Sequence, residues 1–86
     1  MPDLSRPAVI TVYSKPDCHL CDEAILTLRR IQSDFVFDLR ELDISTEEGL
    51  HRAYFDRIPV VEMDGEELCE YVVQEALVRE RLESRR

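Results

Sequence analysis

The sequence feature that most restricts the fold is a strand-forming run that leads, after one short turn, into a helix with two cysteines at its start. Residues 8–13 are rich in β-branched side chains and lie between Pro7 and the turn-like residues 14–17, so they predict a largely buried strand. Residues 18–33 carry apolar side chains at helical spacing, namely Leu20, Ala24, Leu28 and Ile31. This spacing predicts one apolar stripe along a helix. A strand followed directly by a helix is typical of α/β proteins.

The same alternation continues in the middle of the chain. Residues 35–44 are rich in strand-forming side chains in both phases, which predicts a second strand with both faces partly covered. Ser45 or Thr46, followed by two glutamates, predicts the start of a short helix that runs through Tyr54. A hydroxyl cap with acids in the first turn favours a helix start.

The second half of the chain begins with a strong local turn signal. Asp64-Gly65 separates the strand-like runs 58–63 and 66–69, and an Asp-Gly pair in this position predicts a two-residue hairpin. Residues 71–83 predict a C-terminal helix that frays at residues 84–86. The predicted order is β-α-β-α-β-β-α. A right-handed crossover makes the first two strands parallel, and the hairpin completes a four-stranded mixed sheet flanked by helices.

The composition restricts the domain count and the compartment. With 86 residues, 44% of them hydrophobic and 35% charged, the chain predicts one globular domain over residues 1–86. Residues 1–7 contain no apolar stretch of signal-peptide length, and no later run approaches a membrane span. Three cysteines, two of them three positions apart, are poor material for a structural disulfide framework. We therefore expect a cytoplasmic protein.

The net charge argues against two classes of partner. The formal charge is −8, and the 11 Lys and Arg residues are dispersed along the chain. Nucleic acids and anionic membranes need clustered cationic side chains to meet their phosphates. We expect no nucleic acid and no membrane among the partners, and we expect a monomer.

Cys18 and Cys21 carry the chemistry that the sequence suggests. Cys18 falls at the start of the first predicted helix, where unpaired amides and the helix dipole stabilise a thiolate and lower its pKa below the free value of about 8.5. Cys21, one turn further on, is expected to be more buried. Cys18 would attack a target disulfide, and Cys21 would resolve the mixed disulfide by attacking the Cys18 sulfur. His19 and Lys15 would add positive potential around Cys18.

Two other interpretations of the cysteine pair stay open. The pair would supply half of a zinc or iron–sulfur site if His19, His51 or Cys69 completed it. The chain would be an interaction module if its thiols were unreactive, with a Cys18 pKa near or above the free value. Cys69 itself is expected to be a buried core residue.

Pro59 is the second feature of the predicted site. It begins a strand, although proline has no donor for the sheet ladder, and a cis Ile58–Pro59 peptide is the candidate explanation. Tyr13, Tyr54 and Tyr71 are expected at the edge of the core, with Tyr13 the nearest to the cysteines.

These motifs together resemble a known family. With the strand, the segment Lys15-Pro16-Asp17-Cys18-His19-Leu20-Cys21, the helix and Ile58-Pro59-Val60 in place, the chain is similar to glutaredoxin-like proteins of the thioredoxin superfamily over nearly its whole length. The resemblance implies a thioredoxin-like fold and a thiol-disulfide oxidoreductase that reduces protein or glutathione mixed disulfides. It implies that Cys18 is the nucleophile, that Cys21 resolves, and that Lys15, Ile58 and Pro59 bind substrate. His19 is placed with these substrate-binding residues.

Two stretches differ from the usual glutaredoxin pattern. His19-Leu20 stands where glutaredoxins usually carry Pro-Tyr, and residues 68–73 lack the Gly-Gly pair at which the glutamyl end of glutathione binds. Glutathione and a thioredoxin reductase-type enzyme are the two candidate electron donors, and no organic cofactor is predicted.

Overall fold

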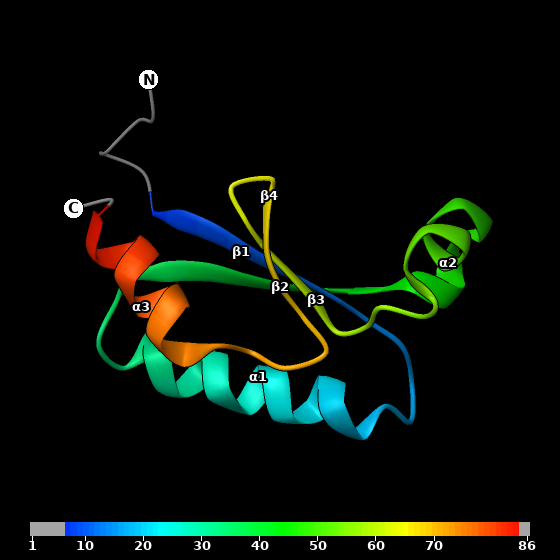
Figure 1. Cartoon of the computed structure of the whole chain (residues 1–86), viewed down its shortest axis with the longest axis horizontal. Coiled ribbons are helices and arrows are strands. Elements are labelled where there is room, and N and C mark those ends of the chain that lie inside the picture. Colours follow the sequence, from blue (N-terminus) through cyan, green and yellow to red (C-terminus); the bar gives the residue numbers. More distant parts are fainter. Residues whose placement is uncertain (1–6, 85–86) are drawn as a thin grey trace.

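The computed structural model describes residues 7–84, and its elements follow the predicted order (Figure 1). The strands are β1 (Ala8–Ser14), β2 (Phe37–Asp43), β3 (Val60–Met63) and β4 (Glu66–Glu70). The helices are α1 (His19–Gln32), α2 (Glu48–Tyr54) and α3 (Glu75–Ser84), and a 3-10 turn, η1, covers Ile44–Thr46. The expected lack of a signal sequence concerns mainly residues 1–6, which lie outside the described residues. Of the residues expected to fray, 85–86 also lie outside them, whereas Ser84 is the last residue of α3.

The four strands form one mixed sheet in the order β2-β1-β3-β4. β1 pairs with β2 in parallel and with β3 antiparallel, and β3 pairs with β4 antiparallel. The predicted α/β architecture is confirmed. The register places Ser14 opposite Asp43, so the C-terminal ends of β1 and β2 lie together, at the end of the sheet where α1 begins.

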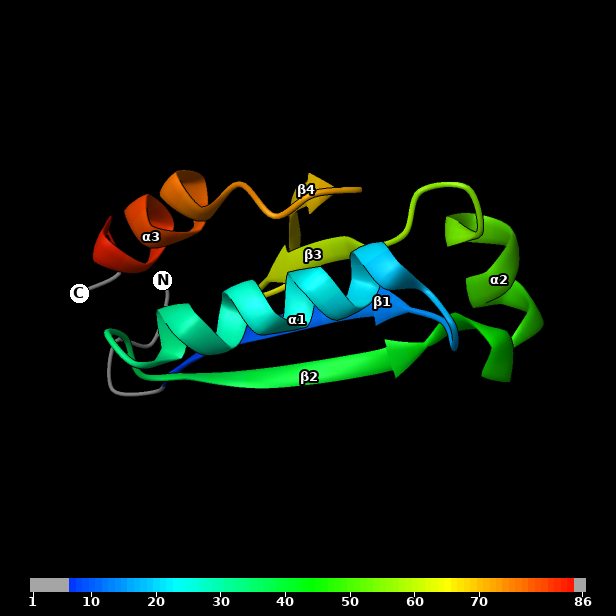
Figure 2. The ribbon, with the colours of Figure 1, turned by 90° about the horizontal axis from the view of Figure 1, so that it is seen from below.

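The helices cover the sheet unequally (Figure 2). α1 lies across one face with α3 beside it, whereas α2 lies beyond the ends of the strands (Figures 1 and 2). The main core lies under α1, where Ile10 and Val12 of β1 pack with Leu28 and Ile31. Within residues 7–84 no helix is both long and apolar enough to cross a membrane.

Asp64-Gly65 turns β3 into β4, as predicted. The two residues have φ of 52° and 88°, and a two-residue hairpin turn with positive φ at both positions favours glycine at the second. Asp64 also fastens the hairpin to β1. Its carboxylate accepts a hydrogen bond from the Val9 N–H at 3.0 Å, and its own N–H donates to the Val9 carbonyl at 2.8 Å.

Two predicted helix starts are wrong. α3 begins at Glu75 instead of Tyr71, because Tyr71 has a φ of 68° and a right-handed helix cannot pass through a left-handed residue. α2 has Glu47 at its N-cap with no side-chain cap. The predicted capping residues lie instead in η1, where Asp43 accepts a hydrogen bond from the Ser45 N–H at 2.8 Å.

β2 is covered on one face only, which corrects the expectation that both faces are covered. Phe37 packs into the main core, whereas Asp38, Arg40 and Leu42 are exposed. β2 is an edge strand, and α2 does not reach its outer face (Figure 2).

Candidate active site

Cys18 is the N-cap of α1, with extended backbone angles of φ −104° and ψ 105°. The turn that precedes it needs one left-handed residue, Asp17, with a φ of 60°. Aspartate tolerates this conformation better than most residues. The Sγ of Cys18 accepts a hydrogen bond from the Cys21 N–H at 3.2 Å. The sulfur therefore takes the place that a serine or aspartate oxygen occupies at other helix starts.

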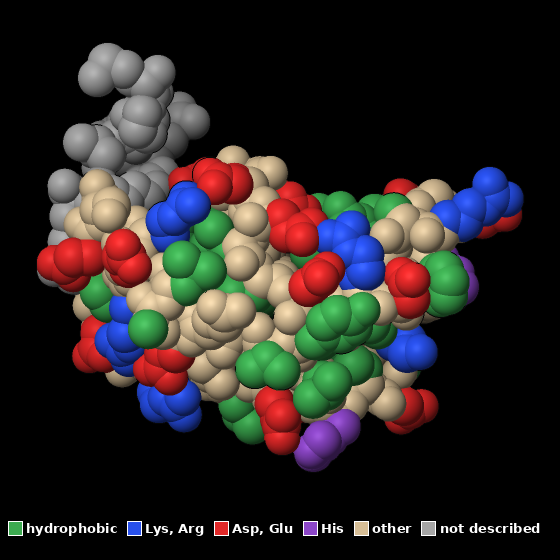
Figure 3. All heavy atoms as spheres, viewed as in Figure 1, with side chains coloured by type: hydrophobic (Ala, Val, Ile, Leu, Met, Phe, Trp, Pro, Cys, Tyr) green, Lys and Arg blue, Asp and Glu red, His purple; other side chains and the backbone are tan. Residues whose placement is uncertain are grey.

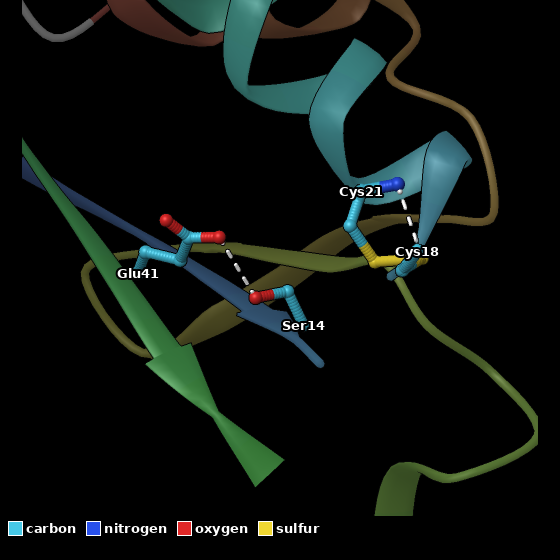
Figure 4. Close-up of a disulfide and its surroundings, with 4 residues drawn as sticks. All are labelled: Ser14, Cys18, Cys21 and Glu41. Carbon is cyan, nitrogen blue, oxygen red and sulfur yellow. Dashed lines mark hydrogen bonds between the residues drawn. A yellow bond between two sulfur atoms is a disulfide. The ribbon is translucent and has the colours of Figure 1, made fainter. Parts of the chain in front are cut away.

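Cys18 and Cys21 form a disulfide, with their Cα atoms 5.2 Å apart (Figure 4). Cys18 is partly exposed, whereas Cys21 is 1% exposed. An incoming thiol or disulfide therefore reaches the pair through Cys18. The predicted difference in exposure between the two thiols is confirmed.

A second apolar cluster lies beneath the disulfide and is built from Cys21, Ile44 and Ile58. Tyr13 and Tyr54 pack against it, with their rings stacked at 4.3 Å between centroids. A hydrogen bond to Glu62, followed by burial, raises the pKa of the Tyr13 phenol well above its ordinary value. The prediction that Tyr13 lies near the cysteines is confirmed.

The Ile58–Pro59 peptide is cis, as predicted, and Ile58 is 8% exposed. The turn after β4 holds this segment. Tyr71 donates its backbone N–H to the Pro59 carbonyl at 2.8 Å and its hydroxyl to the Asp56 carbonyl at 2.6 Å. One residue beyond β4 thus fixes the loop that carries Pro59 and whose Ile58 packs with Cys21.

Arg57 ties the same loop to β4. Its guanidinium donates to the carboxylates of Glu67 and, at 3.0 Å, of Glu70, and these hydrogen bonds raise the pKa of Arg57. The guanidinium also lies 5.4 Å from the centroid of the Tyr54 ring. Tyr71 and Arg57 together give the proline loop two independent attachments to the hairpin.

An acidic cavity opens on the β2 side of the disulfide. Ser14 is 3% exposed and is the only buried polar side chain in the described part of the chain; it donates to Glu41 Oε2 at 2.9 Å (Figure 4). The cavity has a volume of about 330 Å³, and its lining comprises Ser14, Lys15, Pro16, Asp17, Asp22, Glu41 and Asp43. Lys15, a predicted substrate-binding residue, is exposed at this cavity.

A smaller and less polar cavity, of about 80 Å³, lies between α1 and the β4–α3 connection. Its lining comprises Leu20, Glu23, Ala24, Thr27, Tyr71, Val72 and Val73. Leu20 is 42% exposed, Tyr71 46% and Val72 62%. The apolar stripe predicted along α1 wrongly included Leu20, because the buried position at this end of the helix belongs to Cys21. No local sequence signal indicated that Tyr71 lies at the site.

The remaining candidate residues lie either at the surface or in the main core. His19 is exposed, and its Nε2 lies 3.2 Å from Glu23 Oε1. His51 is exposed and stacks on Phe55. Cys69 is 4% exposed in the main core, as predicted, and not in the cluster beneath the disulfide. Among residues 7–84 no three His, Cys, Asp or Glu side chains are grouped so as to hold a metal ion.

The fold and the cysteine pair together define a class. A four-stranded mixed sheet with a Cys-X-X-Cys disulfide at the start of its first helix is the arrangement of thioredoxin-like redox domains. Within that class, the chain belongs to the family described as Glutaredoxin-like domain (DUF836), whose model matches residues 9–83. The predicted family is confirmed.

Individual relatives agree with this assignment. The chain is 30% identical to the uncharacterized protein Rv0508 of Mycobacterium tuberculosis over 81 residues, which cover 88% of this chain and 82% of that protein. The solution NMR structure of protein Ne2328 from Nitrosomonas europaea has a TM-score of 0.81 at 34% identity, over 95% of this chain and 99% of that one. A thioredoxin variant from Halobacterium salinarum shares the fold, with a TM-score of 0.65 at 20% identity, over 93% of this chain and 75% of that one.

Proposed function

We propose that the protein is a dithiol oxidoreductase that reduces the disulfides of other molecules, with Cys18 as the nucleophile and Cys21 as the resolving thiol. The observation that carries the proposal is the position of Cys18 Sγ at the N-terminus of α1, where it accepts the Cys21 N–H. After reduction the same N–H and the positive end of the helix face the sulfur, and both stabilise a thiolate.

The reaction proceeds by two thiol–disulfide exchanges. The Cys18 thiolate attacks one sulfur of the substrate disulfide, so that a new Cys18–substrate bond forms while the substrate S–S bond breaks and the other half leaves as a thiolate. Cys21 then loses its proton and attacks Cys18 Sγ, which releases the second substrate thiolate and forms the Cys18–Cys21 disulfide. Two electrons pass from the protein to the substrate. A thiol donor such as glutathione, or a thioredoxin reductase-type enzyme, would restore the dithiol in a reducing compartment such as the cytoplasm.

Three serine variants test the proposal, with reduction of insulin by dithiothreitol as the assay. We expect Cys18→Ser to lower the rate to that of dithiothreitol alone. We expect Cys21→Ser to accumulate a mixed disulfide with substrate, visible as an added mass. Cys69→Ser is the matched control, because Cys69 is buried in the main core, and it should keep the wild-type rate.

Each contrary result has a distinct meaning. Full activity in Cys18→Ser would refute the proposed nucleophile. An inactive wild-type protein whose Cys18 alkylates no faster than a free thiol would favour an interaction module. Stoichiometric zinc or iron in the purified protein would favour a metal or cluster site at the cysteine pair.

A further inference from the structure

Two different surfaces flank the disulfide on opposite sides. The cysteines follow β1, which lies second in the sheet order β2-β1-β3-β4. The acidic cavity lies on the side of β2, which supplies Glu41 and Asp43, whereas the smaller cavity lies on the side of β4 and its connection to α3. A substrate segment that lies over Cys18 and runs from the β2 side towards the β4 side would contact both cavities.

The surface on the β4 side is a small cavity whose apolar lining comprises Leu20, Ala24, Tyr71, Val72 and Val73; these five residues are called the apolar notch, and Glu23 and Thr27 line the same cavity. Leu20 stands between Cys18 and Cys21 in the sequence, so the notch begins within the Cys-X-X-Cys motif at the start of α1. Figure 3 shows hydrophobic side chains gathered over the start of α1 and the β4–α3 connection, with acidic side chains around them. The cavity of about 80 Å³ has space for one small aliphatic side chain.

The surface on the β2 side is an acidic rim, defined here by Asp17, Asp22, Glu41 and Asp43. Four carboxylates face one ammonium group, that of Lys15, around this cavity. The formal charge of the whole chain is −8, so the rest of the protein does not cancel the negative potential of the acidic rim. An anionic ligand is repelled here, and a Lys or Arg side chain is attracted.

The notch and the rim together select one kind of substrate. We infer that the preferred substrate is a protein segment whose disulfide cysteine lies beside an aliphatic residue and a Lys or Arg, and that glutathione, which carries net negative charge, is disfavoured. The inference rests on the proposed function, since the segment is bound in order to be reduced. The aliphatic side chain enters the apolar notch, and the cationic side chain faces the acidic rim.

Single-turnover kinetics with the reduced protein measure this preference without an electron donor. The probes are peptides whose cysteine carries a 2-pyridyl disulfide. The Cys18 thiolate attacks the cysteine sulfur of the peptide, the S–S bond breaks, and 2-thiopyridone leaves and is followed by absorbance. The first two probes are Val-Cys-Lys and Lys-Cys-Val, which differ in the side of the cysteine that carries each residue. In a second pair Glu replaces Lys, in a third pair Ser replaces Val, and the last probe is the pyridyl disulfide of glutathione. Methyl 2-pyridyl disulfide, small and neutral, reports the intrinsic reactivity of Cys18.

We expect the better Val/Lys probe to react at least about tenfold faster than the glutathione probe at low ionic strength, and the gap to narrow as salt screens the rim. The double change Asp17→Asn and Asp22→Asn should lower the Lys-over-Glu ratio about threefold or more. Asp38→Asn removes one carboxylate charge, against two in the double variant, from the exposed face of β2, and it should leave the ratio unchanged. Ratios are compared because a nearby charge also alters the reactivity of Cys18.

The notch is tested in the same way. Val72→Glu should lower the Val-over-Ser ratio about fivefold or more, since it places a charge where an aliphatic side chain is bound. Val36→Glu is the matched control. Val36 is 87% exposed and lies just before the first residue of β2, whereas Asp43 lies at the other end of that strand.

The outcomes separate this inference from the proposed function. A normal rate with methyl 2-pyridyl disulfide and equal rates for all peptides would overturn the inference and leave the oxidoreductase intact. No reaction with that small probe would overturn the proposed function itself. A dimer in sedimentation that Val72→Glu dissociates would assign the apolar notch to a second copy of the chain, and would also overturn the inference.

Discussion

Removal of one hydroxyl group should loosen the proline loop beside the cysteines. In Tyr71→Phe the ring stays in the apolar notch, but the hydrogen bond to the Asp56 carbonyl at 2.6 Å is lost. A neutral hydrogen bond contributes about 1 kcal/mol net, and this carbonyl lies at the surface, where water can replace the phenol. We therefore expect the free energy of unfolding to fall by about 1 kcal/mol, which lowers the Tm of a domain of this size by about 4–8 °C.

The backbone conformation of Tyr71 gives a second prediction, in which a smaller residue at this position is the more stable one. Its φ of 68° costs a non-glycine residue about 1–2 kcal/mol, and glycine escapes this cost. Tyr71→Gly should therefore be more stable than Tyr71→Ala by about 1 kcal/mol, although glycine in a helix or strand is less stable than alanine.

Urea unfolding of the oxidised proteins measures both differences, and hydrogen exchange of the amides at residues 56–60 shows whether the loosening is confined to the loop. A Tyr71→Phe protein that is as stable as the wild type, with loop amides that exchange at the wild-type rate, would show that the hydroxyl does not hold the loop. A Tyr71→Ala protein at least as stable as Tyr71→Gly would show that the left-handed backbone carries no cost.

Two further predictions concern ionisable contacts. Arg30 and Arg79 lower the pKa of Glu75, so Glu75 stabilises the fold above its unfolded-state pKa and ceases to do so as the pH falls through its lowered folded-state pKa. Glu75→Gln should thus be less stable than the wild type in urea at pH 7 and equal to it in strong acid; a difference that persists in acid would contradict the charge mechanism. At the acidic cavity, Glu41→Ala leaves the buried Ser14 hydroxyl without its acceptor and should cost about 1–2 kcal/mol, whereas Ser14→Ala should cost less. Equal losses in urea unfolding would refute that asymmetry.

The sequence predicts this fold well where local chemistry decides the structure. Asp64-Gly65 specifies its turn through the φ values that the hairpin needs, and the cysteine pair identifies the helix start. The periodicity was less informative about which apolar side chains are buried. Cys21, Ala24, Leu28 and Ile31 share the buried face of α1, and Leu20, about 100° away from Cys21 on the helix, is left at the surface.

The contacts that complete the site join residues far apart in the sequence. Ser14 meets Glu41 across 27 positions, and Tyr71 meets Asp56 across 15. Neither pair has a local signal. The first contact depends on the register of β1 and β2, and the second depends on a left-handed residue that is not glycine, Tyr71. For this reason the cysteines could be predicted as the site, but the surfaces around them could not.

Lys15 is the only lysine in the sequence, and it is exposed at the acidic cavity beside the disulfide. Apart from the terminal amine, an amine-reactive ester therefore has one point of attachment in the whole chain. A bifunctional cross-linker attached to Lys15 would join the protein to a molecule bound over its cysteines. A molecule bound to another face would not be cross-linked through a lysine of this protein, because no other lysine is present. Lys15 is thus a natural site for selective cross-linking, and peptide mapping of the cross-linked product would identify the partner and the segment of the partner that enters the site.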